Sequence, residues 1–410
     1  MGGRRTRGVT GVAALAAVCA LALLAPGAPS ADAASAAPRA GAEDAVTAQV
    51  RVAAASTTRI GEIAAADVAA MSTREKAASL VMAHIPSTDP AVLQAFMRST
   101  QAGGFILMGA NIPATEDELR VITDALTIDP ALPPLIGIDE EGGDVARLPW
   151  DRFASSLTLK TQPAADVERA FAGRGALVQR AGIGVNFGII ADVTPDAGHF
   201  IWRRSFGWPP EQAADRVAAA VTGEGTQALS TLKHFPGHGA AAGDSHTSIP
   251  TTDLPSAQWR AVDAPPFVAG IAAGAPIVMF GHLAFTAVDP APASLSPEWH
   301  RILREELGFT GVTVTDDLGM LQASGHPGYR DPVANAVAAL AAGNDLLLGV
   351  MFSTPETAAA IIDGVVAAVE SGSIPQTRLD EAATRVHALR LQLAGAGRGM
   401  LPCAACAPAD

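Results

Sequence analysis

The chain has 410 residues, of which 49% are hydrophobic and 17% charged, so it is neither disordered nor fibrous and can form one large α/β barrel or two ordinary domains. Its formal net charge of −13 argues against nucleic acid and against anionic membrane surfaces as partners. Composition alone indicates a globular protein and identifies no ligand.

The first 36 residues have the three parts of a secretory signal peptide. Residues 1–8 are basic, residues 12–25 are apolar, and residues 28–36 supply the small side chains that a signal peptidase needs. The apolar run is short for a membrane span and ends at Pro26. We therefore expect residues 1–36 to be removed, with no stable membrane insertion of the mature protein.

Two details of this leader concern export. Cleavage fits equally well after Ala33 and after Ala36, since small residues precede both positions. The Arg4–Arg5 pair suggests twin-arginine export, but the residues that follow it fit that route poorly and favour the Sec route. By either route we expect a secreted protein.

The segments that flank the expected domain are of low complexity. Residues 37–65 are rich in alanine and are typical of a linker, and residues 396–410 are expected to form a flexible tail. Cys19 is lost with the leader, which leaves Cys403 and Cys406 in the tail. A C-x-x-C pair can bind metal or cycle redox, but with no second pair and no following helix a small disulfide is favoured.

Residues 66–395 show a regular alternation of apolar and amphipathic stretches. Ser72 and Glu75 form a capping-box pattern that predicts the start of a helix in "STREKAASLVMAH". Such alternation is typical of βαβ units with a parallel sheet. The apolar runs are 103–111, 132–141, 182–193, 229–237, 275–285, 311–320 and 342–350, and the clearest amphipathic stretches are 116–126, 165–182, 210–225 and 296–309.

Polar side chains follow most of the apolar runs. In an open doubly wound sheet the ligand crevice draws on the strands at one switch point, whereas in a closed barrel all βα loops meet on one face. A charged residue can also simply end a strand, but that explanation is weak for five runs in succession. We therefore predict a single catalytic domain with a TIM-like (β/α)8 barrel, from the strand-end residues Asp139, Asp192, Lys233 with His234, His282 and Asp316.

Asp316 and Asp317 come directly after the β-branched run of "GVTVTDDLGM". Strand alternation directs their side chains oppositely, so we expect only one to face the barrel mouth. A carboxylate at a rigid strand end suits a nucleophile or a charge stabiliser. For Asp317 the N-cap of the following helix is an equally good interpretation.

The stretch 233–250, "KHFPGHGAAAGDSHTSIP", combines titratable side chains with a glycine-rich loop. Asp244 and His246 are two residues apart, so in extended chain the aspartate can fix the imidazole tautomer. A metal site, a proton relay and a clamp for sugar hydroxyls are all compatible with this stretch. The loop is expected to move because of Gly237, Gly239 and Gly243.

A zinc site would draw its ligands from the same stretch, and zinc would supply a hydroxide nucleophile. Lys233 next to His234 disfavours a cation there, and the sequence has neither a helical H-x-x-x-H pair nor a second carboxylate cluster. The metal interpretation is therefore disfavoured. Its candidate ligands are His234, His238, Asp244 and His246.

Other charged residues near the expected mouth are ambiguous by themselves. Asp139 ends an apolar run and Arg147 follows eight residues later, a combination that suits the hydroxyl pairs of a sugar but equally a surface ion pair. Arg203 and Arg204 in "WRRSFGWPP" present the same two alternatives.

Together these segments resemble glycoside hydrolase family 3, and within it the single-barrel β-N-acetylhexosaminidases. The resemblance covers most of residues 70–395, in the order of the family. "KHFPGHG" followed by "DSH" is its most specific part. The other matching segments are "IDEEGG" with Arg147, "RRSFG", "APASLSP", "LREELGFTGVTVTDDLGM" and "AGNDLLL".

The resemblance implies a role for each matching residue and no cofactor. Asp316 is the expected nucleophile, and His246, supported by Asp244, is the expected acid/base of a retaining mechanism. His238 and Asp192 are second candidates, for which a structural role is as good an interpretation. The expected sugar contacts are Asp139, Arg147, Arg204, Lys233 and His234.

Two features depart from the family pattern. Similar enzymes usually have "GGRV" where this chain has "GGDV", so Asp144 stands in place of an arginine and alters the charge near the mouth. The stretch 199–210 is bulkier than usual, and its Trp202 and Trp208 can stack on sugar faces or simply cover the rim. Both features concern substrate choice and leave the reaction unchanged.

We therefore expect a secreted, metal-independent, retaining β-N-acetylhexosaminidase that acts on a carbohydrate substrate, namely muropeptide or chitin fragments. The sequence does not indicate an oligomeric state. A β-glucosidase of the family usually draws its acid/base from a second domain, for which the sequence leaves no room after residue 395. A phosphorylase fits export poorly, and a non-catalytic glycan-binding protein would be expected to have lost one of Asp244, His246 and Asp316.

Overall fold

The computed structural model describes residues 58–225 and 227–395, all within one compact unit. Where the description begins, residues 58–70 form a helix, so the last part of the expected linker is helical. Within these ranges no helix is both long and apolar enough to cross a membrane. The expected signal peptide, the first part of the linker and the tail with Cys403 and Cys406 lie outside the described residues.

Eight parallel strands form one sheet in the order β10-β1-β2-β3-β4-β5-β7-β9. They are short and almost wholly buried, as expected of strands that are covered by helices outside and by side chains inside. The strands are β1 (Val81–Ala83), β2 (Gly104–Leu107), β3 (Leu135–Ile138), β4 (Val185–Ile190), β5 (Leu229–Phe235), β7 (Ile277–Phe280), β9 (Val312–Thr315) and β10 (Leu347–Leu348).

The two ends of the sheet meet. Val314 in β9 forms a parallel bridge with Leu346, the residue just before β10. The Thr315 N–H donates to the Leu346 carbonyl at 3.1 Å, and the Leu346 N–H donates to the Thr313 carbonyl at 2.9 Å. Since β10 also pairs with β1, the sheet closes into the predicted TIM-like barrel. A separate parallel pair, β6 (Thr251–Thr252) with β8 (Ala284–Phe285), lies outside it.

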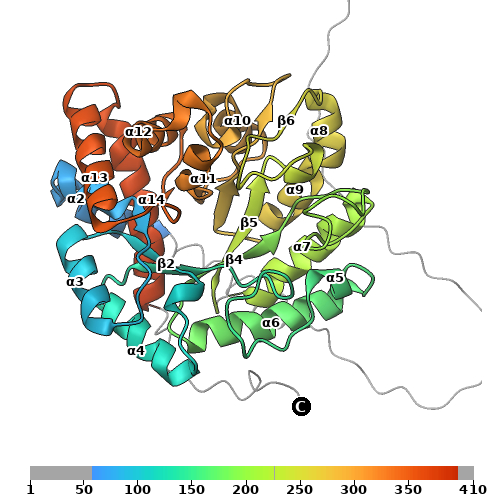
Figure 1. Ribbon diagram of the computed structural model, residues 1–410, viewed down its shortest axis with the longest axis horizontal. Coiled ribbons are helices and arrows are strands. Elements are labelled where there is room, and N and C mark those ends of the chain that lie inside the picture. The colour runs from blue at the N-terminus through green and yellow to red at the C-terminus, as the bar shows by residue number, and fades with distance from the viewer. Residues whose placement is uncertain (1–57, 226, 396–410) are drawn as a thin grey trace, which may run out of the picture. The chain divides into compact units, whose positions relative to one another are not determined.

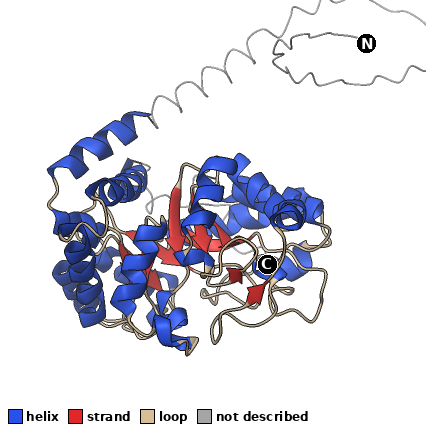
Figure 2. Cartoon of the chain, turned by 90° about the horizontal axis from the view of Figure 1, so that it is seen from above, coloured by secondary structure: helices blue, strands red, loops and turns tan. Residues whose placement is uncertain are grey.

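Helices form a ring around the strands in chain order (Figure 1), and the view turned by 90° shows helices on either side of the strands (Figure 2). The chain thus follows the repeating βα pattern of a barrel. The helices are α2 (Thr73–Ser79), α3 (Pro90–Thr100), α4 (Glu116–Leu126), α5 (Ser156–Leu159), α6 (Ala164–Arg180), α7 (Pro210–Glu224), α8 (Ser256–Val262), α9 (Ala264–Ala272), α10 (Pro297–Arg301), α11 (Leu318–Ala323), α12 (Pro332–Ala342), α13 (Pro355–Glu370) and α14 (Gln376–Gly395).

Each of the seven apolar runs contains one strand of the barrel, but the first barrel strand lies elsewhere. The capping box at Ser72 is present, with Glu75 N–H donating to the Ser72 hydroxyl at 3.3 Å. The helix it starts ends at Ser79, and the next residues, Val81–Ala83, form β1 rather than more helix. The amphipathic stretch 296–309 also differs from a regular helix, because α10 continues as a π-helical turn over Ile302–Glu306.

Large side chains fill the barrel and the layer around it. A Cβ atom on Gly137 of β3 would lie 2.7 Å from the Phe187 ring, so this glycine makes room for a phenylalanine of β4 inside the barrel. Outside, Phe235 of β5 packs edge-on against Trp259 and Phe267 at centroid distances of 6.0 and 5.2 Å. This packing holds the end of β5, which carries Lys233 and His234.

Candidate active site

The carboxyl ends of the barrel strands open on a cavity of about 170 Å³. Active sites of this architecture lie at that face, where the βα loops converge. Seven of the eight predicted site residues line the cavity, and the eighth, Asp244, is bonded to one of them. The seven are Asp139, Arg147, Arg204, Lys233, His234, His246 and Asp316.

Asp139, directly after β3, joins two cations. Its carboxylate accepts from Lys233 Nζ at 2.8 Å and from an Arg147 nitrogen at 3.2 Å. Burial alone would raise the pKa of Asp139, but Lys233 and Arg147 outweigh it and lower the pKa to about 2. Asp139 is therefore ionised over the whole neutral range. The pairing predicted as either a sugar clamp or an ion pair is an ion pair that lines the cavity.

Glu141 completes this network and was not predicted. It binds Arg204 through two hydrogen bonds of 2.8 and 2.7 Å and lies 2.8 Å from Lys233 Nζ. Lys233 is thus held between Asp139 and Glu141, which raise its pKa although burial would lower it. The signal was present in the sequence, since residues two apart tend to share one side of an extended chain.

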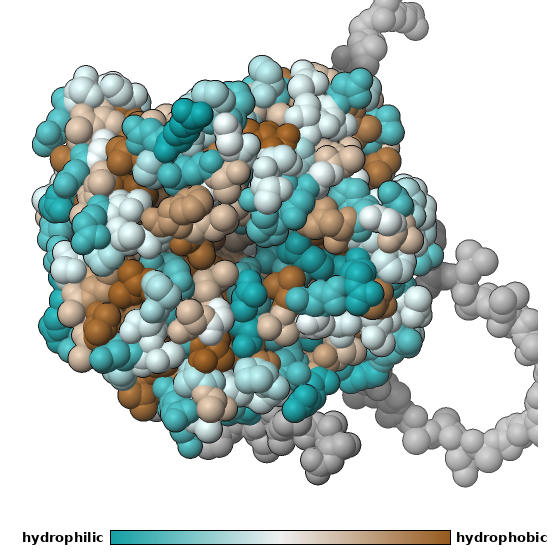
Figure 3. Space-filling view, in the orientation of Figure 1, coloured by the Kyte–Doolittle hydropathy of each residue, from teal (hydrophilic) through white to brown (hydrophobic). Residues whose placement is uncertain are grey.

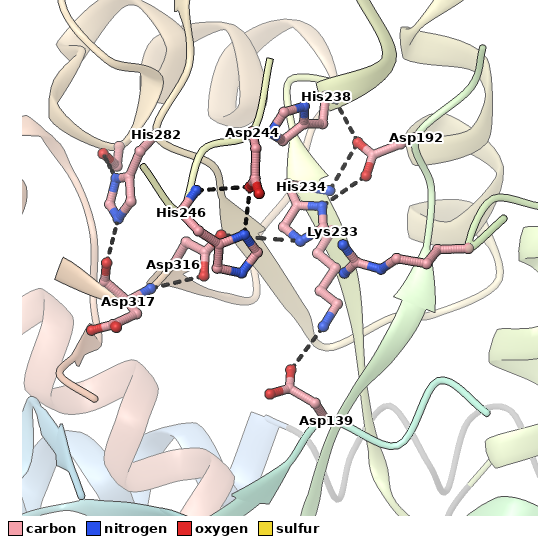
Figure 4. Close-up of polar contacts among 12 residues, drawn as sticks. Asp139, Asp192, Lys233, His234, His238, Asp244, His246, His282, Asp316 and Asp317 are labelled. Atoms are coloured by element: carbon pink, nitrogen blue, oxygen red, sulfur yellow. Dashed lines mark hydrogen bonds and ion pairs between the residues drawn. The ribbon is translucent and has the colours of Figure 1, made fainter. Parts of the chain in front are cut away.

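His234 is fixed by a buried aspartate. Asp192, at the end of β4, contacts His234 Nδ1 at 2.7 Å and accepts from the His234 N–H at 3.0 Å (Figure 4). Burial would raise the pKa of Asp192, but His234 and His238 lower it to about 2. With Nδ1 engaged, His234 Nε2 lies 4.0 Å from a carboxylate oxygen of Asp316.

His238 stands apart from the cavity. Its N–H donates to Asp192 at 2.6 Å, while both ring nitrogens are buried without a hydrogen-bond partner. Burial lowers the pKa of His238 to about 4, which keeps its imidazole neutral. Of the two interpretations given to His238 and Asp192, the geometry favours the structural one for His238, while Asp192 orients His234.

Asp316 directly follows β9 and lines the cavity. Its N–H donates to the Phe280 carbonyl at 2.8 Å, which extends the β7–β9 ladder to the aspartate itself. Burial would raise the pKa of Asp316, but the rings of His234 and His282 hold it below its usual range. The result is a carboxylate on a rigid strand end, ionised at neutral pH.

Asp317 serves the backbone. It is the N-cap of α11, with Gly319 N–H donating to Oδ1 at 2.9 Å. It also accepts from the N–H groups of Val350 and Met351, both at 2.8 Å, in the loop after β10. The N-cap interpretation is what the structure shows, and the same carboxylate joins two loops of the mouth.

His282, two residues after β7, contacts the backbone next to Asp316. Its Nδ1 lies 2.7 Å from the Ser294 hydroxyl and its Nε2 lies 2.8 Å from the Asp317 carbonyl. Burial lowers the pKa of His282. The sequence indicated His282 as a polar strand end, but its partners come from segments that only the fold brings together.

Asp244 and His246 lie on the glycine-rich loop after β5. Asp244 Oδ1 is 2.6 Å from His246 Nδ1 and also accepts the His246 N–H at 3.0 Å. The predicted i, i+2 pairing is therefore present. Figure 4 shows this pair together with Asp316, and His246 and Asp316 line the same cavity.

Two residues near the departures from the family pattern line the cavity, namely Val145 after Asp144 and Arg204 after Arg203. Arg203 binds Asp144 through two bonds of 2.6 and 3.1 Å, and both side chains are exposed. Lys160 Nζ lies 3.7 Å over the Trp202 ring, so a protein cation already occupies one face of that indole. Neither Trp202 nor Trp208 lines the cavity.

The described residues contain no group of three or more His, Cys, Asp and Glu side chains placed to hold a metal ion. Of the candidate ligands, His234 Nδ1 is engaged by Asp192 and His246 Nδ1 by Asp244.

Residues 72–389 match the family model described as the glycosyl hydrolase family 3 N terminal domain. The chain is 32% identical to a beta-hexosaminidase of Methylococcus capsulatus over 283 residues, covering 66% of this chain and 81% of that protein. It is 30% identical to an uncharacterized secreted glycosyl hydrolase of Arthroderma benhamiae, covering 75% of this chain and 89% of the other.

Among solved structures, a family 3 beta-N-acetylglucosaminidase from Paenibacillus superposes with a TM-score of 0.75 and 32% identity. The alignment covers 82% of this chain and 65% of that chain. The family match spans the barrel and the residues that line its cavity. The chain therefore belongs to glycosyl hydrolase family 3 and is a glycoside hydrolase.

Proposed function

We propose that this protein is a secreted, retaining β-N-acetylhexosaminidase that releases terminal β-linked N-acetylglucosamine from muropeptide or chitin fragments. The observation that carries the proposal is the placement of Asp316 and His246 in one cavity, with Asp244 only 2.6 Å from His246 Nδ1. Similarity to beta-hexosaminidases supports the choice of sugar. The leader of residues 1–36 supports export.

In the first step the Asp316 carboxylate attacks the anomeric carbon. The bond from that carbon to the glycosidic oxygen breaks, and protonated His246 gives the Nε2 proton to the departing oxygen. Asp244 keeps its hydrogen bond to Nδ1 and stabilises the imidazolium before transfer. The products are a glycosyl ester of Asp316 and the free aglycone.

In the second step neutral His246 removes a proton from water, and the water oxygen attacks the anomeric carbon. The ester bond to Asp316 breaks, the carboxylate is restored, and the sugar leaves with the configuration that it had in the substrate. Both catalytic groups belong to the chain, so the cycle needs no metal ion. A histidine in place of a second carboxylate also avoids repulsion between two anions.

The network around Lys233 is the proposed binding site for sugar hydroxyls. Asp139, Lys233 and Arg204 are already paired with one another or with Glu141, so their donors and acceptors are fixed before the substrate arrives. A sugar can then accept from the cations and donate to the carboxylates without reorganising them. Arg147 and His234 complete the set.

The test is release of nitrophenol from the β-N-acetylglucosaminide and from the β-glucoside. We expect wild type to cleave the N-acetyl substrate in EDTA, and Asp316→Ala and His246→Ala to lose at least about a hundredfold in kcat/KM. His326→Ala, at an exposed histidine that does not line the cavity, is the matched control and should stay active.

Three other outcomes would assign a different function. Turnover that requires added phosphate would indicate a phosphorylase, and preference for the glucoside would indicate a β-glucosidase. Tight binding of chitin oligomers by folded protein that turns over neither substrate would indicate a glycan-binding protein.

A further inference from the structure

The loop after β10 is fixed at the mouth of the cavity. Val350 and Met351 line the cavity, and their N–H groups are held by the Asp317 carboxylate at 2.8 Å each. The loop also packs tightly onto α11, because a Cβ atom on Gly319 would lie 2.4 Å from the Met351 carbonyl oxygen. The residue that follows, Phe352, is thus carried on an anchored backbone.

Phe352 has an unusual conformation and an unusual exposure. At 61% it is the most exposed large hydrophobic side chain among the described residues. Its φ is 60°, a left-handed conformation that is unfavourable for most residues and that glycine adopts freely. A bulky residue in this position points to a use for the side chain that offsets the backbone strain.

The other described non-glycine residue with positive φ shows the contrast. Gln101, at φ 56°, is the C-cap of α3, and its N–H donates to the Met97 carbonyl at 2.9 Å, an ordinary way to end a helix. Phe352 ends no helix; it precedes Thr354, the N-cap of α13. Local helix capping therefore does not account for Phe352.

The size of the cavity indicates what this side chain meets. At about 170 Å³ the cavity is smaller than the 300 Å³ or more of typical ligand pockets, so it suits a single sugar ring. The aglycone, on the other side of the scissile bond, must then lie at the mouth of the cavity. Figure 3 shows a hollow near the centre of this face, with hydrophilic residues on one side and hydrophobic residues on the other.

We propose that Phe352, with Met351 beside it, is a platform for the leaving group and selects substrates whose aglycone is a second sugar ring. The apolar face of a pyranose stacks on an aromatic ring, and the Phe352 ring is exposed on the residue that follows Met351, which lines the cavity. Asp144 and Arg203 are exposed, paired with each other and next in sequence to the cavity-lining Val145 and Arg204, and they offer no such surface. This inference rests on the proposed function and adds a residue that determines its specificity.

The test compares two substrates that differ only in the aglycone, N,N′-diacetylchitobiose and methyl β-N-acetylglucosaminide. We expect Phe352→Ala and Phe352→Gly to lower kcat/KM for the disaccharide about three- to tenfold and to leave the methyl glycoside within about twofold. Phe352→Trp should keep the disaccharide preference. An unchanged ratio of the two kcat/KM values in both small variants would overturn the inference.

Thermal unfolding separates a platform from a merely structural phenylalanine. Glycine relieves the strain at either left-handed position, so Phe352→Gly and the control Gln101→Gly should both unfold at or above the wild-type Tm. Only Phe352→Gly should lose the disaccharide preference. A Tm several degrees lower for Phe352→Gly alone would show that the ring supports the fold, against the proposal. Wild type that hydrolyses neither substrate would instead refute the proposed function.

Discussion

Asp244 and His246 form a hydrogen bond of 2.6 Å although their side chains are 50% and 58% exposed. The second Asp–His pair of the site, Asp192 with His234, has almost the same length, 2.7 Å, but is buried. A histidine that is open to water can exchange protons between the two halves of a reaction, whereas a buried one is held in a single orientation. This contrast supports proton transfer by the exposed pair and substrate binding by the buried one.

The first prediction concerns Asp244. Asp244→Asn keeps an oxygen for His246 Nδ1–H but removes the negative charge that stabilises the imidazolium. Because the first step needs protonated His246, we expect kcat/KM to fall about ten- to a hundredfold. The measurement is kcat/KM of wild type and variant on the β-N-acetylglucosaminide, and an unchanged value would contradict the dyad.

The second prediction separates the two steps. His246→Ala should still react with a substrate whose leaving group needs no protonation, such as 2,4-dinitrophenyl β-N-acetylglucosaminide, because Asp316 is intact. Without a base to activate water, the glycosyl-enzyme should then accumulate. Mass spectrometry should show protein with one added N-acetylhexosamine residue, on the peptide that carries Asp316. If the added mass lies on another residue, this nucleophile is wrong. The same holds if His246→Ala gains no more mass than Asp316→Ala.

The third prediction concerns the stability of the charge network. Lys233→Met leaves Asp139 and Glu141 buried without their shared cation, so we expect a loss of about 3–5 kcal/mol in the free energy of unfolding. Lys76→Met is the matched control: Lys76 pairs with Asp380 at 2.7 Å, but that carboxylate is 41% exposed and can be hydrated instead. Urea unfolding of both variants measures the difference, and equal losses would contradict the explanation.

The fourth prediction concerns Asp263, whose carboxyl oxygens are buried without partners. Burial, and to a lesser degree Asp192, raise the pKa of Asp263 to about 8, above the value of about 4 in an unfolded chain. The stability that the protonated form contributes is present below about pH 4 and is lost as pH rises to about 8. Asp263→Asn cannot ionise, so its Tm relative to wild type should rise by several degrees from pH 5 to pH 8. Asp124→Asn, at an exposed side chain, should show no such trend.

The fifth prediction concerns the rim. Asp144 neutralises Arg203 through two hydrogen bonds, and both side chains are exposed. Asp144→Asn removes the negative charge and leaves Arg203 as an unpaired cation beside the mouth. Substrates with a carboxylate on the aglycone, such as those ending in N-acetylmuramic acid, should show a lower KM that rises again with salt. Neutral chitobiose should be unaffected. A parallel change for both substrates would mean that the pair acts only on loop structure.

Periodicity in the sequence predicted most of the barrel. Seven runs bounded by glycine or proline each contain a strand, because buried parallel strands need continuous apolar residues. β1 was not predicted because Val81–Ala83 is only three residues long and follows a capped helix, with no glycine or proline between them. A segment so short is a strand only because β2 and β10 lie on either side of it.

In the site, too, some contacts follow from the local sequence and others only from the fold. Asp244 with His246 depends on a spacing of two residues, which the sequence displays, and so does Asp139 with Glu141, although the second of these was not predicted. The three amides on Asp317 come from Gly319 and from a loop that is 33 or 34 residues away. The N-cap pattern indicates the amide of Gly319, but no local pattern can indicate those of Val350 and Met351, since only barrel closure brings them to Asp317.

Closure between β9 and β10 also sets an order of assembly. β1 finds its second neighbour in β10, near the other end of the fold, so the ring can close only after almost the whole domain has been synthesised. The loop that holds Val350 and Met351 against Asp317 forms at that same last step. An unfinished chain therefore has Asp316 but no complete mouth around it, and glycan cleavage is confined to molecules that have finished folding.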